Sequence, residues 1–348
     1  MRRSSFNRFI SYLPAFCLGV ALLSGCDREQ PKYQSTENWK SAWSAAETIG
    51  NPVDEGFTKG RIANEAALNG HGDLLIEWAA AERQPWVKSL CLASLSYARA
   101  FQGDLSGHKS YLLPALRTVQ AADEWDRVRV VKSLLKATAA GVWMENQDVA
   151  KLRAWVGEGD IERTPATAAM LCDWLETLRS QTTEPITKEK KVVEAIDFIL
   201  ARIGRFRPVD RLELVVRLAP LLVESKKEDE LILAVKEFDS ASDSDYEVLT
   251  ALVILEAALG REAEAARRFG RAKERAAAKQ TGDCIAPYVR LAKAAEAVGV
   301  DYVGLTSIYR QGLEKSGDRP GFHGTIAKAM TYAAMARFEE SFQRTKSR

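Results

Sequence analysis

The sequence predicts an all-α fold, an α-solenoid of antiparallel helix pairs, and three observations indicate it. Beyond residue 38, apolar residues recur at helical spacing, and almost no segment alternates as a half-buried strand would. Alanine-rich segments repeatedly end in glycine, the residue that most readily terminates a helix. These glycines recur: 38 residues separate Gly103 from Gly141, and 39 separate Gly260 from Gly299. A repeat of about 40 residues is typical of stacked helical hairpins.

Local signals place the individual helices. Prolines in first turns and caps such as those in Ser242–Asp245 mark helix starts. A single hairpin cannot bury its apolar face, so hairpins stacked in a row shield one another. We expect helix pairs near 57–83, 86–121, 124–156, 164–203, 208–238, 243–279 and 282–315, with end helices at 39–49 and about 320–336 that cap opposite ends of the stack.

The first 25 residues have the order of an export signal. Arg2, Arg3 and Arg8 form a basic region, and residues 9–23 carry no charge. This apolar run is shorter than the roughly 20 residues that a spanning helix needs. It therefore fits the apolar region of a signal peptide.

The end of this run, Leu23-Ser24-Gly25-Cys26, resembles the lipobox of bacterial lipoproteins. The resemblance covers the first 26 residues and implies cleavage before Cys26, followed by lipidation of that cysteine. Two or more acyl chains anchor a protein stably. Asp27 is similar to the sorting signal that retains some lipoproteins in the inner membrane, so the resemblance favours that membrane and leaves the outer one open. An ordinary secretory signal with an incidental cysteine is the alternative.

The sequence therefore divides into five parts. Residues 1–25 are the predicted signal peptide, and 26–38 are the lipidated cysteine with a polar tether. Residues 39–180 hold the N-terminal helical repeats. Residues 181–190 break the repeat phase and are predicted to be an inserted loop or a hinge. Residues 191–348 hold the C-terminal repeats and a capping helix.

One helix pair resembles a tetratricopeptide repeat (TPR). That family has a glycine in the turn, small residues five and twelve positions later, and an aromatic residue nine positions later. Gly260, Ala265, Phe269 and Ala272 match these positions. The resemblance decays after Gly103 and Gly299, so we describe residues 57–336 as TPR-like, with a generic array of helical hairpins as the alternative. A TPR-like array implies a right-handed superhelix.

Composition excludes several classes of function. Without Arg2, Arg3 and Arg8, 46 basic residues remain against 47 acidic ones, and they form no basic stripe, so no nucleic-acid partner is expected. The mature chain keeps Cys91, Cys172 and Cys284, an odd number in apolar helical stretches. We expect three buried small hydrophobic side chains instead of a disulfide framework.

The sequence carries no recognisable catalytic motif. His71, His108 and His323 each lie close to a glycine, and we expect exposed turn residues and no metal ligands. No phosphate-binding loop, nucleophile elbow or dinucleotide-binding motif is present. We therefore expect neither an enzyme nor a cofactor.

These features together predict a membrane-tethered scaffold that binds protein or peptide partners at the bacterial cell envelope. A stack of helix pairs offers a long face for such partners. Most of the eight tryptophans are expected to pack between helices, whereas Trp143 and Trp155 are candidates for a partner-binding groove. The alternative is an envelope enzyme that acts on glycan or peptidoglycan through a cleft lined by two carboxylates.

Overall fold

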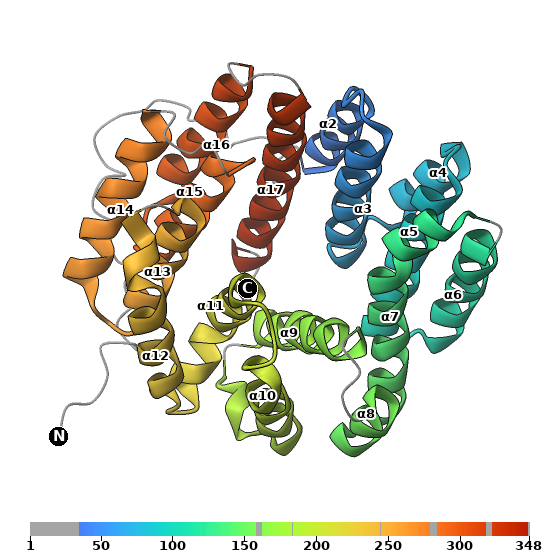
Figure 1. Cartoon of the computed structure of the whole chain (residues 1–348), viewed down its shortest axis with the longest axis horizontal. Coiled ribbons are helices and arrows are strands. Elements are labelled where there is room, and N and C mark those ends of the chain that lie inside the picture. Colours follow the sequence, from blue (N-terminus) through green and yellow to red (C-terminus); the bar gives the residue numbers. More distant parts are fainter. Residues whose placement is uncertain are drawn as a thin grey trace. The chain divides into compact units, whose positions relative to one another are not determined.

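A computed structural model describes residues 35–120, 122–157, 162–182, 184–243, 245–278, 284–317 and 322–346. The prediction of an all-α fold is confirmed, because 85% of these described residues are helical, with 16 α-helices and no strand among them (Figure 1). The α-helices are α2 (Ser35–Glu47), α3 (Pro52–Leu68), α4 (Gly72–Ala81), α5 (Pro85–Phe101), α6 (Leu105–Gln120), α7 (Glu124–Asn146), α8 (Val149–Val156), α9 (Arg163–Gln181), α10 (Lys190–Ile203), α11 (Pro208–Glu224), α12 (Glu228–Phe238), α13 (Tyr246–Ala258), α14 (Glu262–Ala277), α15 (Pro287–Ala297), α16 (Tyr302–Ser316) and α17 (Phe322–Lys346). Two short 3-10 helices, η1 (Ile186–Lys188) and η2 (Asp239–Asp243), lie between them.

Most helix ends follow the sequence signals. Asn51, Asp123 and Asp245 accept hydrogen bonds from backbone N–H groups at the starts of α3, α7 and α13. Gly260 and Gly299 adopt φ values of +70° and +81° two residues after the ends of α13 and α15. This left-handed conformation is the one that favours glycine, so these two repeat markers end helices as predicted.

Gly141 does not end a helix, which corrects the sequence interpretation. It lies inside α7, which continues to Asn146. A Cβ atom at Gly141 would lie 2.4 Å from Nε2 of His108 on α6. The glycine is therefore needed for the close approach of α6, and its spacing from Gly103 does not mark two equivalent turns.

Neighbouring helices pack in a regular order. Each odd-numbered helix from α3 to α15 packs against the next odd-numbered one, and the even-numbered helices flank this succession. The largest core cluster runs from Tyr97 on α5 to Leu255 on α13 and includes Ile186 of the predicted loop or hinge. The core thus continues across residues 181–190 without a break.

The first and last described helices pack against each other, whereas the sequence predicted caps at opposite ends. α17 contacts both α2 and α3, as Figure 1 also shows. α17 also extends to Lys346, ten residues beyond the predicted end. Small side chains allow the close approach, because both helices present alanines to one buried cluster: Ala42 and Ala46 on α2, and Ala329, Ala333 and Ala336 on α17.

Polar contacts fix the register of this joint. The indole Nε1 of Trp39 donates a hydrogen bond of 2.8 Å to Oε1 of Glu340, and Nε2 of His71 lies 2.5 Å from the same oxygen. Asn38 donates to Glu339 at 3.1 Å. Charged and aromatic groups far apart in sequence therefore hold α2 and α17 together.

The three described cysteines are free and buried, as predicted. Burial raises the pKa of the Cys91 and Cys172 thiols to about 12. Because the thiolate is the reactive form, we expect the folded protein not to react with a disulfide reagent such as DTNB at neutral pH. Rapid reaction of Cys91 or Cys172 before denaturation, followed by peptide mapping, would contradict this packing.

Candidate functional site

An aromatic surface lies where α3, α5 and α7 begin. The Phe57 ring meets the Trp86 ring edge-on at a centroid distance of 5.5 Å. The Arg129 guanidinium lies over Trp86 at 5.3 Å from the ring centroid, within range of a cation–π interaction. Trp86 itself is buried, while Phe57 is 46% exposed. Trp86 therefore forms the floor of a surface that Phe57 and Arg129 flank.

Trp125 and Val128 extend this surface along α7. The side chain of Asp123 caps the helix, which places Trp125 in the first turn. Trp125 is 75% exposed and Val128 is 63% exposed. Trp125 lies three residues before Val128 and four before Arg129, so it neighbours both of them on the helix surface. We call Phe57, Trp86, Trp125, Val128 and Arg129 the aromatic patch.

The floor of the aromatic patch is held in place locally. The Trp86 indole donates a hydrogen bond of 3.0 Å to Oε1 of Gln84. A Cβ atom at Gly56 would lie 2.1 Å from Cη2 of Trp86, so only glycine leaves room for the ring. Pro85 in the first turn of α5 fixes the chain just before Trp86. The patch is therefore a defined arrangement of side chains.

The second candidate site is a polar cluster around Asp173 on α9. Its carboxylate accepts a 2.6 Å hydrogen bond from the Tyr97 hydroxyl and lies 2.5 Å from Nζ of Lys136. Arg217 also pairs with Asp173 and reaches Glu176 at 2.6 Å. Burial alone would raise the pKa of Asp173, but the Lys136 and Arg217 cations hold this pKa well below its usual range.

This charged cluster continues onto α3, α15 and α17. Arg337 pairs with Glu65 at 3.4 Å. Burial would raise the pKa of Glu65, but Arg337 and Lys293 lower it. Lys293 lies nearby on α15. Desolvation by the surrounding protein and, to a smaller extent, the positive charge of Arg337 lower the pKa of Lys293 to about 8. Charged side chains from α3, α15 and α17 thus influence one another across the domain.

These carboxylates lack the pKa pattern of a glycosidase pair. A general acid needs a pKa raised toward neutrality. The pKa values of Glu65, Glu82, Asp173 and Glu264 are all shifted downward. Ion pairs and hydrogen bonds hold all four in the charged form. Their arrangement supports structural pairing over proton donation.

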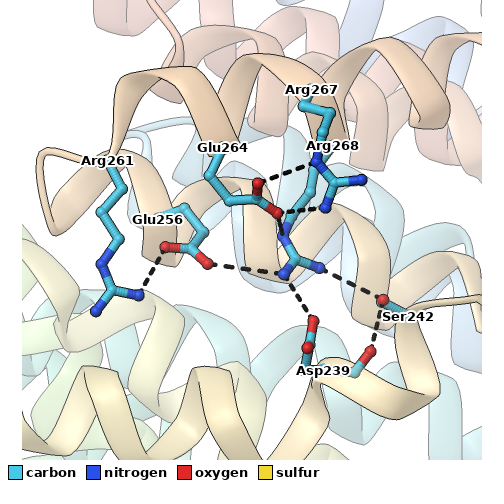
Figure 2. A network of polar contacts seen from close by, with 7 residues as sticks. All are labelled: Asp239, Ser242, Glu256, Arg261, Glu264, Arg267 and Arg268. Atoms are coloured by element: carbon cyan, nitrogen blue, oxygen red, sulfur yellow. Dashed lines mark hydrogen bonds and ion pairs between the residues drawn. The ribbon is translucent and has the colours of Figure 1, made fainter.

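Figure 2 shows a third network, centred on Arg268 of α14. The buried Arg268 guanidinium pairs with Asp239 at 2.6 Å, Glu264 at 2.9 Å and Glu256 at 3.7 Å. Arg261 provides a second cation to Glu256 at 3.1 Å. Glu256 is only 2% exposed. The network connects α13, α14 and η2, which indicates a structural role.

The predicted groove residues do not form an open groove. Trp143 is fully buried, because the α7 face that carries it packs on α9, where its ring meets Trp174 edge-on at 4.8 Å. Its assignment to a partner-binding groove is therefore wrong. Trp155 on α8 is half-buried, and Arg163 lies over its ring at 5.3 Å.

The four positions that resemble a tetratricopeptide repeat lie in a turn and between packed helices. Gly260 lies in the turn, Ala265 and Ala272 are buried, and Phe269 packs at the edge of a core cluster. The repeat also places Arg268 beside Phe269, a buried cation that the sequence pattern did not indicate.

Two of the three histidines, His71 and His108, are not the exposed residues that the sequence predicted, since His71 is half-buried and His108 is buried. His108 is buried in α6, where its Nδ1 lies 2.8 Å from the Ser96 hydroxyl, so it is not an exposed turn residue. Burial lowers its pKa. His71 contacts Glu340, and His323 is exposed. A search of the described residues finds no group of His, Cys, Asp and Glu side chains that could hold a metal ion.

The lipobox-like segment with Cys26 and Asp27 lies outside the described residues. From Ser35 onward, within the ranges given above, no helix combines the length and the apolar character needed to cross a membrane.

The sequence patterns did not indicate the aromatic patch. A signal was present, since Trp125 stands among Asp123, Glu124, Asp126 and Arg127, where a tryptophan has few apolar neighbours to pack against. The contact of Phe57 with Trp86 could not be found from spacing, because it joins residues from two different helices.

Comparisons with known proteins do not assign the chain to a family. No family model matches it, and neither the curated proteins nor the solved structures contain a match. Its function therefore has to follow from the lipobox-like motif and from the surface chemistry of the helical domain.

Proposed function

We propose that this chain is an exported bacterial lipoprotein, anchored through Cys26, whose helical domain binds a protein or peptide partner at the cell envelope. The observation that carries the partner-binding role is the exposed aromatic patch. The role is binding without catalysis or a cofactor, and nucleic acid is not a partner.

The chemistry of the aromatic patch suits a protein partner. Exposed Phe57 packs against buried Trp86, which Arg129 also contacts, and exposed Trp125 and Val128 precede Arg129 on α7. Aromatic residues and arginine are enriched in interface cores, and tryptophan and arginine dominate their binding energies. A tryptophan that is 75% exposed leaves most of its apolar area in water, and covering that area favours association.

The proposed architecture is a TPR-like α-solenoid with a right-handed superhelical course, in which α17 packs back onto α2 and α3. The alternating order of helix contacts and the packing of Gly260, Ala265, Phe269 and Ala272 support it. In this arrangement each hairpin shields its neighbours, which is the logic of a repeat protein.

The proposed location is a bacterial membrane, on the surface that faces away from the cytoplasm. Basic, apolar and small residues precede Cys26 in the order of a lipoprotein signal. Asp27 supports the inner membrane, with the outer membrane as the alternative. Lipid anchoring concentrates the aromatic patch within reach of envelope proteins.

Truncation of Trp125 tests the binding role. We expect Trp125→Ala to weaken partner binding by about 2 kcal/mol or more, the cost of removing an interface hot spot, which corresponds to roughly thirtyfold in Kd. The measurement is co-purification of the full lipidated chain from solubilised envelopes, with quantitative mass spectrometry of the captured proteins.

Leu233→Ala is the matched control, because Leu233 on α12 is 59% exposed and lies outside the aromatic patch. Proteins captured by the native chain and by Leu233→Ala but lost from Trp125→Ala support the proposal. The same captured set with all three chains, or no captured protein with any of them, contradicts it.

A further inference from the structure

The polypeptide enters the helical domain at one particular end of α17. Asn38 and Trp39, one turn into α2, contact Glu339 and Glu340 near the end of α17. At the other end, Ile49 and Asn51 line a small pocket together with Phe322 and Thr325 at the start of α17. α2 and α17 are therefore antiparallel, and Ser35 lies at the C-terminal end of α17.

Several elements meet at this same end. Tyr302, the first residue of α16, stacks on Phe342 of α17 at a centroid distance of 4.3 Å. Arg344 donates a 3.2 Å hydrogen bond to Oδ1 of Asn69, directly after α3. Next to Tyr302, Val303 is 72% exposed. We call the surface formed by Asn69, Tyr302, Val303, Phe342 and Arg344 the entry face.

We propose that the entry face contacts the lipid bilayer that holds the acyl chains of Cys26. This inference rests on the proposed lipid anchoring of that residue. It assigns an orientation to the domain, with the entry face on the membrane and the opposite end of α17 directed away from it.

Chain length supports this orientation. The residues between the lipid and the domain, Cys26–Gln34, number nine, and a fully extended chain of that length spans at most about 30 Å. The 25 residues of α17 form a helix about 37 Å long. If the N-terminal end of α17 faced the bilayer instead, Ser35 would lie farther from the membrane surface than the extended tether reaches.

The chemistry of the entry face suits the lipid–water boundary. Aromatic rings that combine an apolar body with a polar tip, as Tyr302 does, favour this boundary. Exposed Val303 adds apolar area beside it. The Arg344 side chain, which pairs with Glu340 at 3.9 Å, is half exposed and lies within reach of anionic headgroups at this end. The aromatic patch is elsewhere, because Phe57 belongs to the start of α3, whereas the entry face includes Asn69 after its end. Membrane contact therefore leaves the aromatic patch available to a partner.

Fluorescence quenching from the lipid tests the orientation. The full lipidated chain carries Val303→Cys or, as a control, Val128→Cys, each labelled with a small fluorophore. Both native valines are more than 60% exposed, and Cys91, Cys172 and Cys284 are buried, so the label goes to the new cysteine. The proteins are reconstituted into vesicles of phosphatidylethanolamine and phosphatidylglycerol that contain a nitroxide-headgroup lipid.

We expect several-fold stronger quenching at position 303 than at position 128. Equal quenching at both positions, or stronger quenching at 128, in protein that sediments with the vesicles overturns the orientation and leaves the anchoring intact. Failure of the unlabelled chain to sediment with vesicles, with Cys26→Ser as its reference, overturns the anchoring and the orientation together.

Discussion

Replacement of Asp173 by asparagine is expected to destabilise the helical domain by about 3–5 kcal/mol, the usual cost of removing one partner from a buried ion pair. Asp173 is 9% exposed, accepts a hydrogen bond from Tyr97 and forms ion pairs with Lys136 and Arg217. Asparagine keeps the volume but removes the negative charge, so two cations lose the carboxylate that they share. Urea unfolding followed by circular dichroism measures the change.

Asp197→Asn is the control for this experiment. Asp197 pairs with Lys227, but its side chain is 51% exposed, and exposed pairs contribute about 0–1 kcal/mol. A loss at Asp173 no larger than the loss at Asp197 would contradict the structural role of the Asp173 cluster.

The same carboxylate predicts a pH dependence. Its pKa is lower in the folded chain than in the unfolded one, so the unfolded state binds a proton first as the pH falls. The stability that Asp173 contributes is present above the unfolded pKa of about 4 and is lost as the pH falls from there toward the folded pKa. We expect Asp173→Asn to show a shallower loss of stability below about pH 5 than the native chain. A parallel acid profile for both proteins would contradict this contribution.

Replacement of Arg268 by methionine is expected to cost a similar amount, about 3–5 kcal/mol. Methionine retains much of the apolar length of arginine, but it leaves Glu256, which is 2% exposed, with Arg261 as its remaining cation in the network of Figure 2. Asp239 and Glu264 lose the same partner. The free energy of unfolding, measured in urea, reports the loss.

A double-mutant cycle separates the charge effect from packing. Adding Glu256→Gln to Arg268→Met removes the buried charge that Arg268→Met leaves with Arg261 alone, so we expect the double variant to lose less than the sum of the two single losses. Arg207→Met is the surface control, since the Arg207 side chain is 80% exposed beside Asp210. Additive losses at residues 256 and 268 would show that the charges do not couple.

The sequence predicted the helices well because their signals are local. Caps such as Asn51 and Asp245 and the turn glycines Gly260 and Gly299 act within a few residues of the helix that they begin or end. Gly141 shows the limit of such signals: the same residue type serves close packing against His108, which belongs to another helix. A glycine alone does not reveal which of the two roles it has.

The candidate sites were harder to predict because each joins residues from several helices. The aromatic patch combines α3, α5 and α7, and Asp173 meets Tyr97, which is 76 residues away in sequence. The contact of Trp39 with Glu340 spans 301 residues. Helical periodicity identifies which face of a helix is apolar, but it does not identify the distant helix that covers this face. Trp143 was misassigned for this reason.

Partner binding at the envelope and the orientation of the domain both require a lipid on Cys26. The most direct measurement is mass spectrometry of the N-terminal peptide from the chain extracted out of bacterial membranes. Our account predicts that this peptide begins at Cys26 and carries a diacylglycerol thioether with a further acyl chain on its amino group, and that Cys26→Ser abolishes both. An intact, unmodified peptide that spans Ser24, Gly25 and Cys26 in the membrane-extracted protein would contradict it.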